Sequence, residues 1–197
     1  MNKQWTLLVA AAVAMGLCLS AFAAEEGAKF IGSGKCKMCH IAVHKSWEAT
    51  KHAKAMDVLK AGEAKEAKEK AKLDPAKDYT KDETCLACHT TGAGKPGGYN
   101  AKADEKDMEK MAKDLGSVGC EACHGAGEKY SDVHKKIKQD KSEYTDEEMV
   151  KAGTVKPTEK ECKTCHNEKS PTAKEFKFEE ASKTGLHEKP GLKQKKK

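Results

Sequence analysis

The chain has 197 residues, of which 35% are charged, 38% are hydrophobic and only 5% are aromatic, so its own side chains are too polar to fill an ordinary core. The formal net charge is +6, but lysine and glutamate are interleaved, and no patch combines basic with aromatic residues, which argues against nucleic-acid binding. Something other than side chains must supply the apolar interior.

The N-terminus has the pattern of a secretory signal peptide over residues 1–23. Lys3 precedes an apolar run over residues 5–19, and residues 21–23 (AFA) match the A-x-A cleavage pattern. The run is short for a membrane span, although a retained N-terminal anchor is the alternative. No later run is apolar enough to cross a membrane, so we expect residues 24–197 to form a single exported domain.

The first half of the chain predicts two helices and a loop. Residues 41–61 place apolar side chains at helical spacing and predict a helix. Residues 63–72 (EAKEAKEKAK) combine strong helix formers with Glu–Lys pairs, so we expect a solvated helix that ends before Pro75. The glycine-rich residues 90–100 (TTGAGKPGGYN) predict a loop.

Capping signals mark helices in the second half. Asp104 is expected to cap one helix. Thr145 with Glu148, and Thr158 with Glu161, form capping boxes at the starts of two more. No run with a period of two residues indicates a substantial sheet, so the predicted fold class is mainly α.

Eight of the nine cysteines form four copies of one motif, C-x-x-C-H, and the ninth, Cys18, lies in the predicted signal peptide. The copies contain Cys36, Cys39 and His40; Cys85, Cys88 and His89; Cys120, Cys123 and His124; and Cys162, Cys165 and His166. This spacing attaches c-type haem: two thiols bond to the vinyl groups on one porphyrin edge, and the histidine ligates the iron.

A zinc ribbon and a thioredoxin-like redox pair fit the motif less well. A zinc ribbon needs C-x-x-C pairs but no histidine directly after each, and a redox pair of that kind normally occurs once. We therefore predict four c-type haems, with a small multihaem cytochrome c fold of short helices and loops wrapped around them. The macrocycles supply the missing apolar interior, and their propionates make the holoprotein more acidic than the sequence suggests.

Four histidines lie outside the motifs, and four irons need at most four further axial ligands. These histidines are His44, His52, His134 and His187. Most of them are expected to be ligands, a surface position being the alternative for any single one. Met56 and Met149 could compete, but a methionine ligand raises the potential and is typical of a mobile high-potential carrier.

Several stretches resemble the tetrahaem cytochrome c-554 family. They are residues 46–56 (SWEATKHAKAM), 72–89 (KLDPAKDYTKDETCLACH), 95–99 (KPGGY) and 117–125 (SVGCEACHG). The resemblance runs from about Gly34 to Gly127 and is looser after Tyr130. Residues 135–160 differ from the family in both length and sequence. The resemblance implies haems stacked in pairs, three of them with two histidine ligands and one five-coordinate.

Carried over by position, the resemblance also implies which histidines share an iron. The implied pairs are His40 with His134, His124 with His52, and His166 with His187. The second haem, held by Cys85, Cys88 and His89, would have an open distal face. His44 has no counterpart in the family; we favour a surface or non-ligating position close to a haem, and the alternative is that it caps the second haem.

The resemblance implies an electron carrier, not an enzyme. Members of the family are periplasmic; they accept electrons from hydroxylamine oxidoreductase and pass them towards the membrane quinone pool. The sequence therefore predicts an exported carrier between a donor of that kind and a membrane cytochrome or quinone-linked acceptor. A reductase of a small ligand such as nitric oxide at the second haem is the first alternative. A subunit of an extracellular or membrane-linked respiratory chain is the second.

Overall fold

The computed structural model describes residues 27–188, and over that range the fold is mainly α, as predicted. The α-helices are α1 (Ser33–Lys37), α2 (Ile41–Glu48), α3 (Lys65–Lys70), α4 (Glu83–His89), α5 (Glu105–Asp114), α6 (Cys120–His124), α7 (Glu128–Asp140), α8 (Asp146–Lys151), α9 (Glu159–Cys162) and α10 (Phe178–Thr184). Two 3-10 helices, η1 (His52–Lys54) and η2 (Asp57–Leu59), follow α2. No β-strand occurs between residues 27 and 188.

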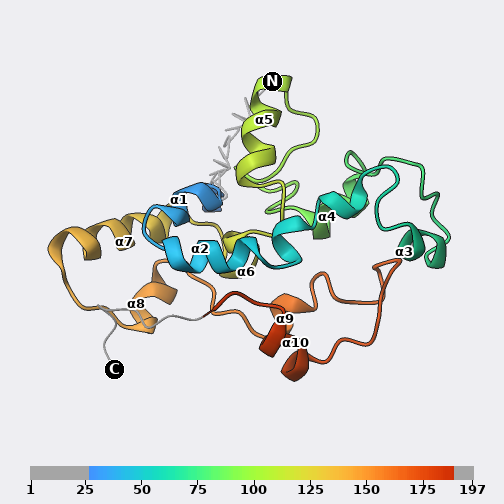
Figure 1. Ribbon diagram of the computed structural model, residues 1–197. Coiled ribbons are helices and arrows are strands. Elements are labelled where there is room, and N and C mark those ends of the chain that lie inside the picture. The colour runs from blue at the N-terminus through green and yellow to red at the C-terminus, as the bar shows by residue number, and fades with distance from the viewer. Residues whose placement is uncertain (1–26, 189–197) are drawn as a thin grey trace, which may run out of the picture.

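The helices are short and spread around a centre formed by α2 and α6 (Figure 1). In this view α7 and α8 lie on one side, α3 and α4 on the other, α9 and α10 below, and α5 projects at the top. Between residues 27 and 188 no helix is long and apolar enough to cross a membrane. The predicted signal peptide, residues 1–23, lies outside the described residues, so it stays a prediction.

The expected helix over residues 41–61 is interrupted after Glu48, so that prediction is wrong in length. The hydroxyl of Thr50 donates to the carbonyl of Trp47 (2.7 Å) and accepts from the backbone N–H of Ala53 (3.3 Å). This side chain replaces helical backbone bonds and turns the chain, as Ser and Thr hydroxyls can do. The indole of Trp47 also donates to the carbonyl of Val118 (3.0 Å), which fixes the turn against the segment before α6.

The helix expected over residues 63–72 is shorter than predicted, and one of its lysines is not solvated. α3 spans only Lys65–Lys70, and the left-handed backbone of Lys72 (φ 57°) ends the segment. Lys68 is buried, its ammonium donates to the carbonyl of Lys60 (2.5 Å), and it lies 5.4 Å from the centre of the Tyr79 ring. Lys68 therefore joins α3 to the segment before it, through Lys60, and to the loop before α4, through Tyr79.

The predicted capping residues are confirmed. The Asp104 carboxylate accepts from the backbone N–H of Asp107 (2.9 Å) at the start of α5. Both capping boxes form, at the starts of α8 and α9. By contrast, no capping signal or periodicity predicted a helix at residues 128–140, where the structure has α7.

The side-chain core is small and divided in two, in keeping with the composition. One cluster holds Leu59, Tyr79, Leu86, Tyr99 and Leu115. The other holds Tyr130, Ile137, Tyr144 and Met149. Met149 is 5% exposed and packs among these side chains, so its place in the fold is that of a core residue.

The glycine-rich segment forms the expected loop and docks in front of α6. The buried hydroxyl of Thr91 donates to the carbonyl of Ser117 (2.7 Å) and accepts from the backbone N–H of Gly119 (2.9 Å). The loop closes so tightly that a Cβ at Gly98 would collide with the carbonyl oxygen of Gly92, whose own φ is +68°. Only glycine fits at these two positions.

A buried carboxylate joins the N-terminal segment to α6. Glu121, 2% exposed, accepts hydrogen bonds from the backbone N–H groups of Ile31 (2.9 Å), Gly32 (2.7 Å) and Gly127 (2.6 Å). Glu121 occupies the position after Cys120, so it connects the third cysteine motif to the segment that leads into the first. Charged acceptors of this kind make stronger hydrogen bonds than neutral ones.

We expect Glu121→Gln to lower the free energy of unfolding by about 2–3 kcal/mol, because the glutamine NH₂ group must face a backbone N–H and leave it unsatisfied. Denaturant unfolding of the haem-loaded protein measures this change.

Glu128→Gln is the matched control. Glu128 accepts one bond, from the exposed backbone N–H of Lys29 (3.0 Å), so its replacement should cost less than about 1 kcal/mol. Equal losses in the two variants would contradict the importance of the buried site.

Candidate haem-binding site

Each C-x-x-C-H motif lies on one turn of helix, as the attachment chemistry requires. The motifs fall at the end of α1, within α4 and α6, and at the end of α9. In the first motif the backbone N–H of His40 bonds to the carbonyl of Cys36 (3.0 Å), and in the fourth that of His166 bonds to Cys162 (3.0 Å). One turn therefore sets two thiols along one side and places the histidine next to them.

The structure brings six of the eight histidines together in three pairs. Ring centroids are 5.5 Å apart for His40 with His134, 6.0 Å for His52 with His166, and 6.2 Å for His124 with His187. A metal–imidazole nitrogen bond is about 2 Å long, so two rings on opposite sides of one ion have centroids about 6 Å apart. The three pairs thus have the spacing that a shared iron requires.

Two of the three expected pairings are wrong. His134 lies opposite His40, as expected, but His52 lies opposite His166 rather than His124, and His187 lies opposite His124 rather than His166. Two contacts of the C-terminal segment account for the exchange.

The first contact is at Gly185, whose carbonyl accepts from Nδ1 of His52 (3.1 Å). The second is at Glu188, whose backbone N–H donates to the hydroxyl of Ser46 on α2 (2.7 Å). The C-terminal segment therefore crosses α2, and His187 reaches the third motif. The spacing of residues in the sequence does not predict that the C-terminal segment crosses α2.

Backbone carbonyls orient four of the histidine rings. In each of these rings Nδ1 donates to the backbone carbonyl of another residue. The pairs are His52 with Gly185 (3.1 Å), His89 with Ala55 (2.6 Å), His124 with Val155 (3.3 Å) and His187 with Glu188 (2.7 Å). A donor at Nδ1 leaves Nε2 as the unprotonated nitrogen, which is the one available to a metal.

Burial favours the neutral form of several of these rings. The pKa values of His40, His124, His134 and His166 all lie below the ordinary value for histidine, and desolvation is the largest cause in each. A neutral imidazole is the form that ligates a metal. The environment of the rings thus favours the ligating form before any iron is bound.

His89 has no opposing histidine among residues 27–188, and His44 does not supply one. The His44 ring lies 5.0 Å from the Trp47 ring, and its Nδ1 is 3.3 Å from a carboxylate oxygen of Glu48 in a geometry that does not make a hydrogen bond. His44 is 8% exposed, so the surface position is wrong, while the other expectation, a non-ligating position close to a haem, stays a prediction. It is a buried residue of α2 packed on its own helix.

The thiols show which motifs are neighbours. The pKa of Cys36 is raised, first by a hydrogen bond with the thiol of Cys120, so the first and third motifs adjoin. Burial raises the pKa of Cys123 to about 11 with further contributions from Cys162 and Cys165, so the third motif adjoins the fourth.

The second motif also adjoins the fourth. Burial raises the pKa of Cys88 to about 11, and the next contributions come from Cys165. The thiols of the first motif thus lie near those of the third, and the thiols of the fourth lie near those of both the third and the second. Chain order does not give this arrangement.

The motif cysteines form neither disulfides nor a metal cage within the described residues. All eight motif cysteines are free of disulfides. Between residues 27 and 188 no group of three or more His, Cys, Asp or Glu side chains converges as a metal cage, whereas a zinc ribbon needs four converging ligands. Paired histidines beside paired thiols fit haem iron instead.

Several side chains around the sites carried no motif of their own. Phe176 stacks on His166 with centroids 4.8 Å apart, and a cavity of about 410 Å³ opens beside these two rings. Tyr130 and Tyr144 lie 5.9 and 6.4 Å from His134. Aromatic residues are scarce in this chain. This scarcity was the one feature of the sequence that could have indicated that the few aromatic residues lie close to the sites.

Comparison with known proteins agrees with this geometry. The family model described as "Cytochrome c554 and c-prime" matches residues 35–125. The solved structure of reduced cytochrome c554 from Nitrosomonas europaea aligns with a TM-score of 0.74 at 37% identity, covering 87% of this chain and 91% of that one. The chain belongs to the cytochrome c554 family.

The curated sequence of cytochrome c-554 from Nitrosomonas europaea is 43% identical over 166 residues. That match covers 81% of this chain and 66% of the relative, just under two thirds of its length. Because the chain belongs to the cytochrome c554 family, it is a c-type cytochrome, and haem is its cofactor.

The histidine pairs predict the effect of removing one ring. His52→Ala and His187→Ala should each convert one low-spin haem to high spin, and the double variant should convert two, because the two rings lie opposite different histidines. Electron paramagnetic resonance of the oxidised protein counts the high-spin centres, and the haem content per chain should stay unchanged.

His44→Ala is the matched control, since His44 is buried but packs on Trp47. Its spectrum should equal that of the wild type. A double variant with only one new high-spin haem would show that His52 and His187 do not serve separate irons.

Proposed function

We propose that this protein is an exported, periplasmic tetrahaem cytochrome that carries electrons between redox proteins. The observation that carries the proposal is the set of three histidine pairs, each at the spacing of two ligands on one iron and each beside a C-x-x-C-H motif. Haem iron supplies reversible one-electron chemistry, and two histidine ligands leave it no free position for a substrate.

In this proposal the protein holds four haems by eight thioether bonds. The attached residues are Cys36, Cys39, Cys85, Cys88, Cys120, Cys123, Cys162 and Cys165. The axial ligands are His40 with His134, His124 with His187, His166 with His52, and His89 alone. Residues 24–197 form the single domain that carries them.

The neighbouring thiols of the motifs support electron transport. They link the first motif to the third, the third to the fourth and the fourth to the second. An electron received at one end has a continuous series of sites to the other. A carrier with two ends can serve a donor and an acceptor at different surfaces.

The resemblance to the family supports the choice of partners. A hydroxylamine-oxidoreductase-like enzyme is the proposed donor, and a membrane cytochrome or another quinone-linked protein is the proposed acceptor. The predicted signal peptide supports a periplasmic location.

A second candidate function is reduction of a small ligand such as nitric oxide at the second haem. One observation favours it: His89 faces no other histidine among the described residues, and His44 is packed against Trp47. An open iron position can bind a small ligand. The electron-carrier role remains the leading proposal because the other three sites have both ligands in place.

Electron paramagnetic resonance with and without nitric oxide tests both functions. We expect three low-spin haems and one high-spin haem, the high-spin signal disappearing on addition of nitric oxide. The same result is expected for His44→Ala. Reversible reduction of all haems at an electrode, without consumption of nitric oxide, would identify a carrier.

Two results would overturn parts of this proposal. Four low-spin haems that bind no nitric oxide would remove the reductase and indicate a ligand opposite His89. Fewer than four haems per chain by mass would show that a C-x-x-C-H motif is not loaded.

A further inference from the structure

The first motif differs from the others in its exposure. Among the eight motif cysteines, only Cys39 is exposed, while the other seven are partly buried. A thioether bond joins the cysteine sulfur to the porphyrin edge, so an exposed Cys39 places one haem edge at the surface. This motif is also one end of the series of neighbouring thiols.

Two exposed apolar residues adjoin this motif. Met38 is 58% exposed and Ile41 is 66% exposed, and they flank Cys39 and His40 in the sequence. The other exposed large hydrophobic residues of the described chain are Val58 and Val150, and both are less exposed (41% and 54%). Exposed apolar residues that cluster, rather than stand singly, mark interaction sites.

Lysines form the rim of the same surface. Lys35 and Lys37 lie on α1, Lys45 lies on α2, and all three are exposed. The ammonium of Lys138, on α7, lies 3.9 Å from the sulfur of Cys39. Figure 1 shows α7 beside α1 and α2 on the same side of the molecule.

Most of these lysines have no acidic partner. Among residues 27–188, the only carboxylate paired with any of the four is that of Glu48, which lies 3.7 Å from Lys37. The surface is therefore positive, with an apolar centre.

The fourth and second motifs lack this combination. At the fourth motif, Lys163 is paired with Glu159 (2.7 Å). At the second, Lys102 is paired with Glu83 (2.6 Å), and Leu86 between the cysteines is buried. Paired charges give little net field, so Lys163 and Lys102 add little attraction for an acidic protein at these two motifs.

We infer that the surface of Lys35, Lys37, Met38, Ile41, Lys45 and Lys138 is the docking site for a redox protein that is acidic around its own cofactor. This inference rests on the proposed electron-carrier function. The lysines steer the partner, the apolar centre excludes water on contact, and the exposed edge at Cys39 shortens the distance for electron transfer.

A flavodoxin, a small acidic electron-transfer protein, serves as the probe. Its anionic flavin hydroquinone gives one electron to a ferric haem. The flavin keeps its N5 proton and becomes the neutral semiquinone, and the iron becomes ferrous. Stopped-flow absorbance measures the second-order rate at a series of ionic strengths. We expect the wild-type rate to fall as salt rises.

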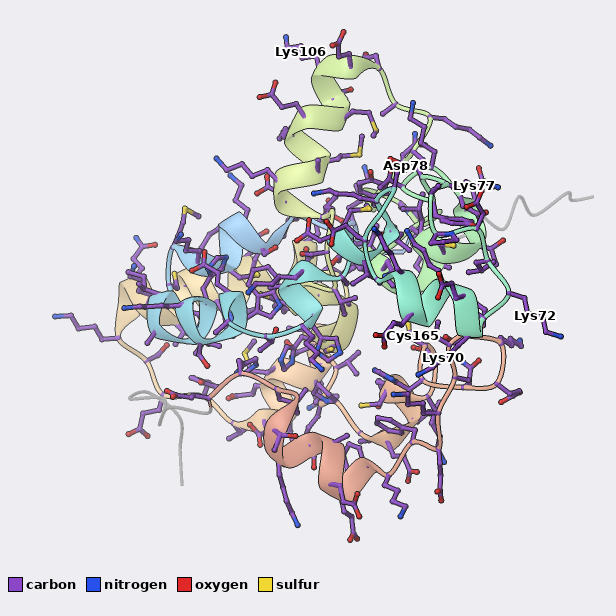
Figure 2. The ribbon with its side chains drawn as sticks, turned by 45° about the vertical axis from the view of Figure 1, so that its right-hand side comes forward. Lys70, Lys72, Lys77, Asp78, Lys106 and Cys165 are labelled. Carbon is purple, nitrogen blue, oxygen red and sulfur yellow. The ribbon has the colours of Figure 1, made fainter. Side chains whose placement is uncertain are left out.

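The double variant Lys37→Glu/Lys138→Glu should react about tenfold more slowly at low salt, because electrostatic steering changes rates by roughly 10–1,000-fold. The matched control is Lys106→Glu/Lys110→Glu, which reverses the same number of charges on α5; Figure 2 shows Lys106 at the tip of that helix, away from the proposed surface. The control should change the rate less than about twofold.

Equal slowing in both variants, or none in the first, would overturn the docking site. If Lys37→Glu/Lys138→Glu loses haem, Lys37→Gln/Lys138→Gln must show a smaller slowing in the same direction. A mediated electrode titration separates the two levels of the proposal. If the haems are reduced reversibly but the lysine variants react at the wild-type rate, only the proposed docking site is contradicted. If the haems are not reduced reversibly, the proposed electron-carrier function is contradicted.

Discussion

The buried carboxylate of Glu121 holds together parts of the chain that lie about 90 residues apart in sequence. Its three backbone donors come from the segment before α1 and from the loop after α6. Because Glu121 stands between two cysteines of a motif, the same side chain that joins these segments also sets the distance between the first and third motifs. A fold with so few apolar side chains depends on such contacts to define where its cofactors lie.

Much of the fold and site was predictable, and the reason is local chemistry. The C-x-x-C-H motifs, the Asp104 cap and the boxes at Thr145 and Thr158 all depend on residues within four positions of one another. The resemblance added the pairing of His40 with His134, whose rings lie 5.5 Å apart in the structure. The local features could be predicted because sequence spacing alone names both partners of each contact.

The errors arose where a distant contact overrides local preference. Thr50 ends α2 because its neighbour Trp47 is anchored to Val118, which the sequence around Thr50 does not reveal. The partners of His52 and His187 were exchanged because the C-terminal segment crosses α2, held by Ser46. Lys68 looks like one more lysine of a solvated helix until the loop that brings Tyr79 over it is known.

The crossing of the C-terminal segment over α2 has a consequence for how the molecule matures. Residues 185–188 leave the ribosome after all four cysteine motifs, yet they contain His187 and the carbonyl that orients His52. Under the proposed ligand set, every haem can be attached before two of the irons have their final environment. Residues 185–188 therefore complete the iron sites last. A chain shortened before Gly185 would carry every haem but lack one axial histidine and the carbonyl that orients another. Its absorption spectrum alone would distinguish it from the complete protein.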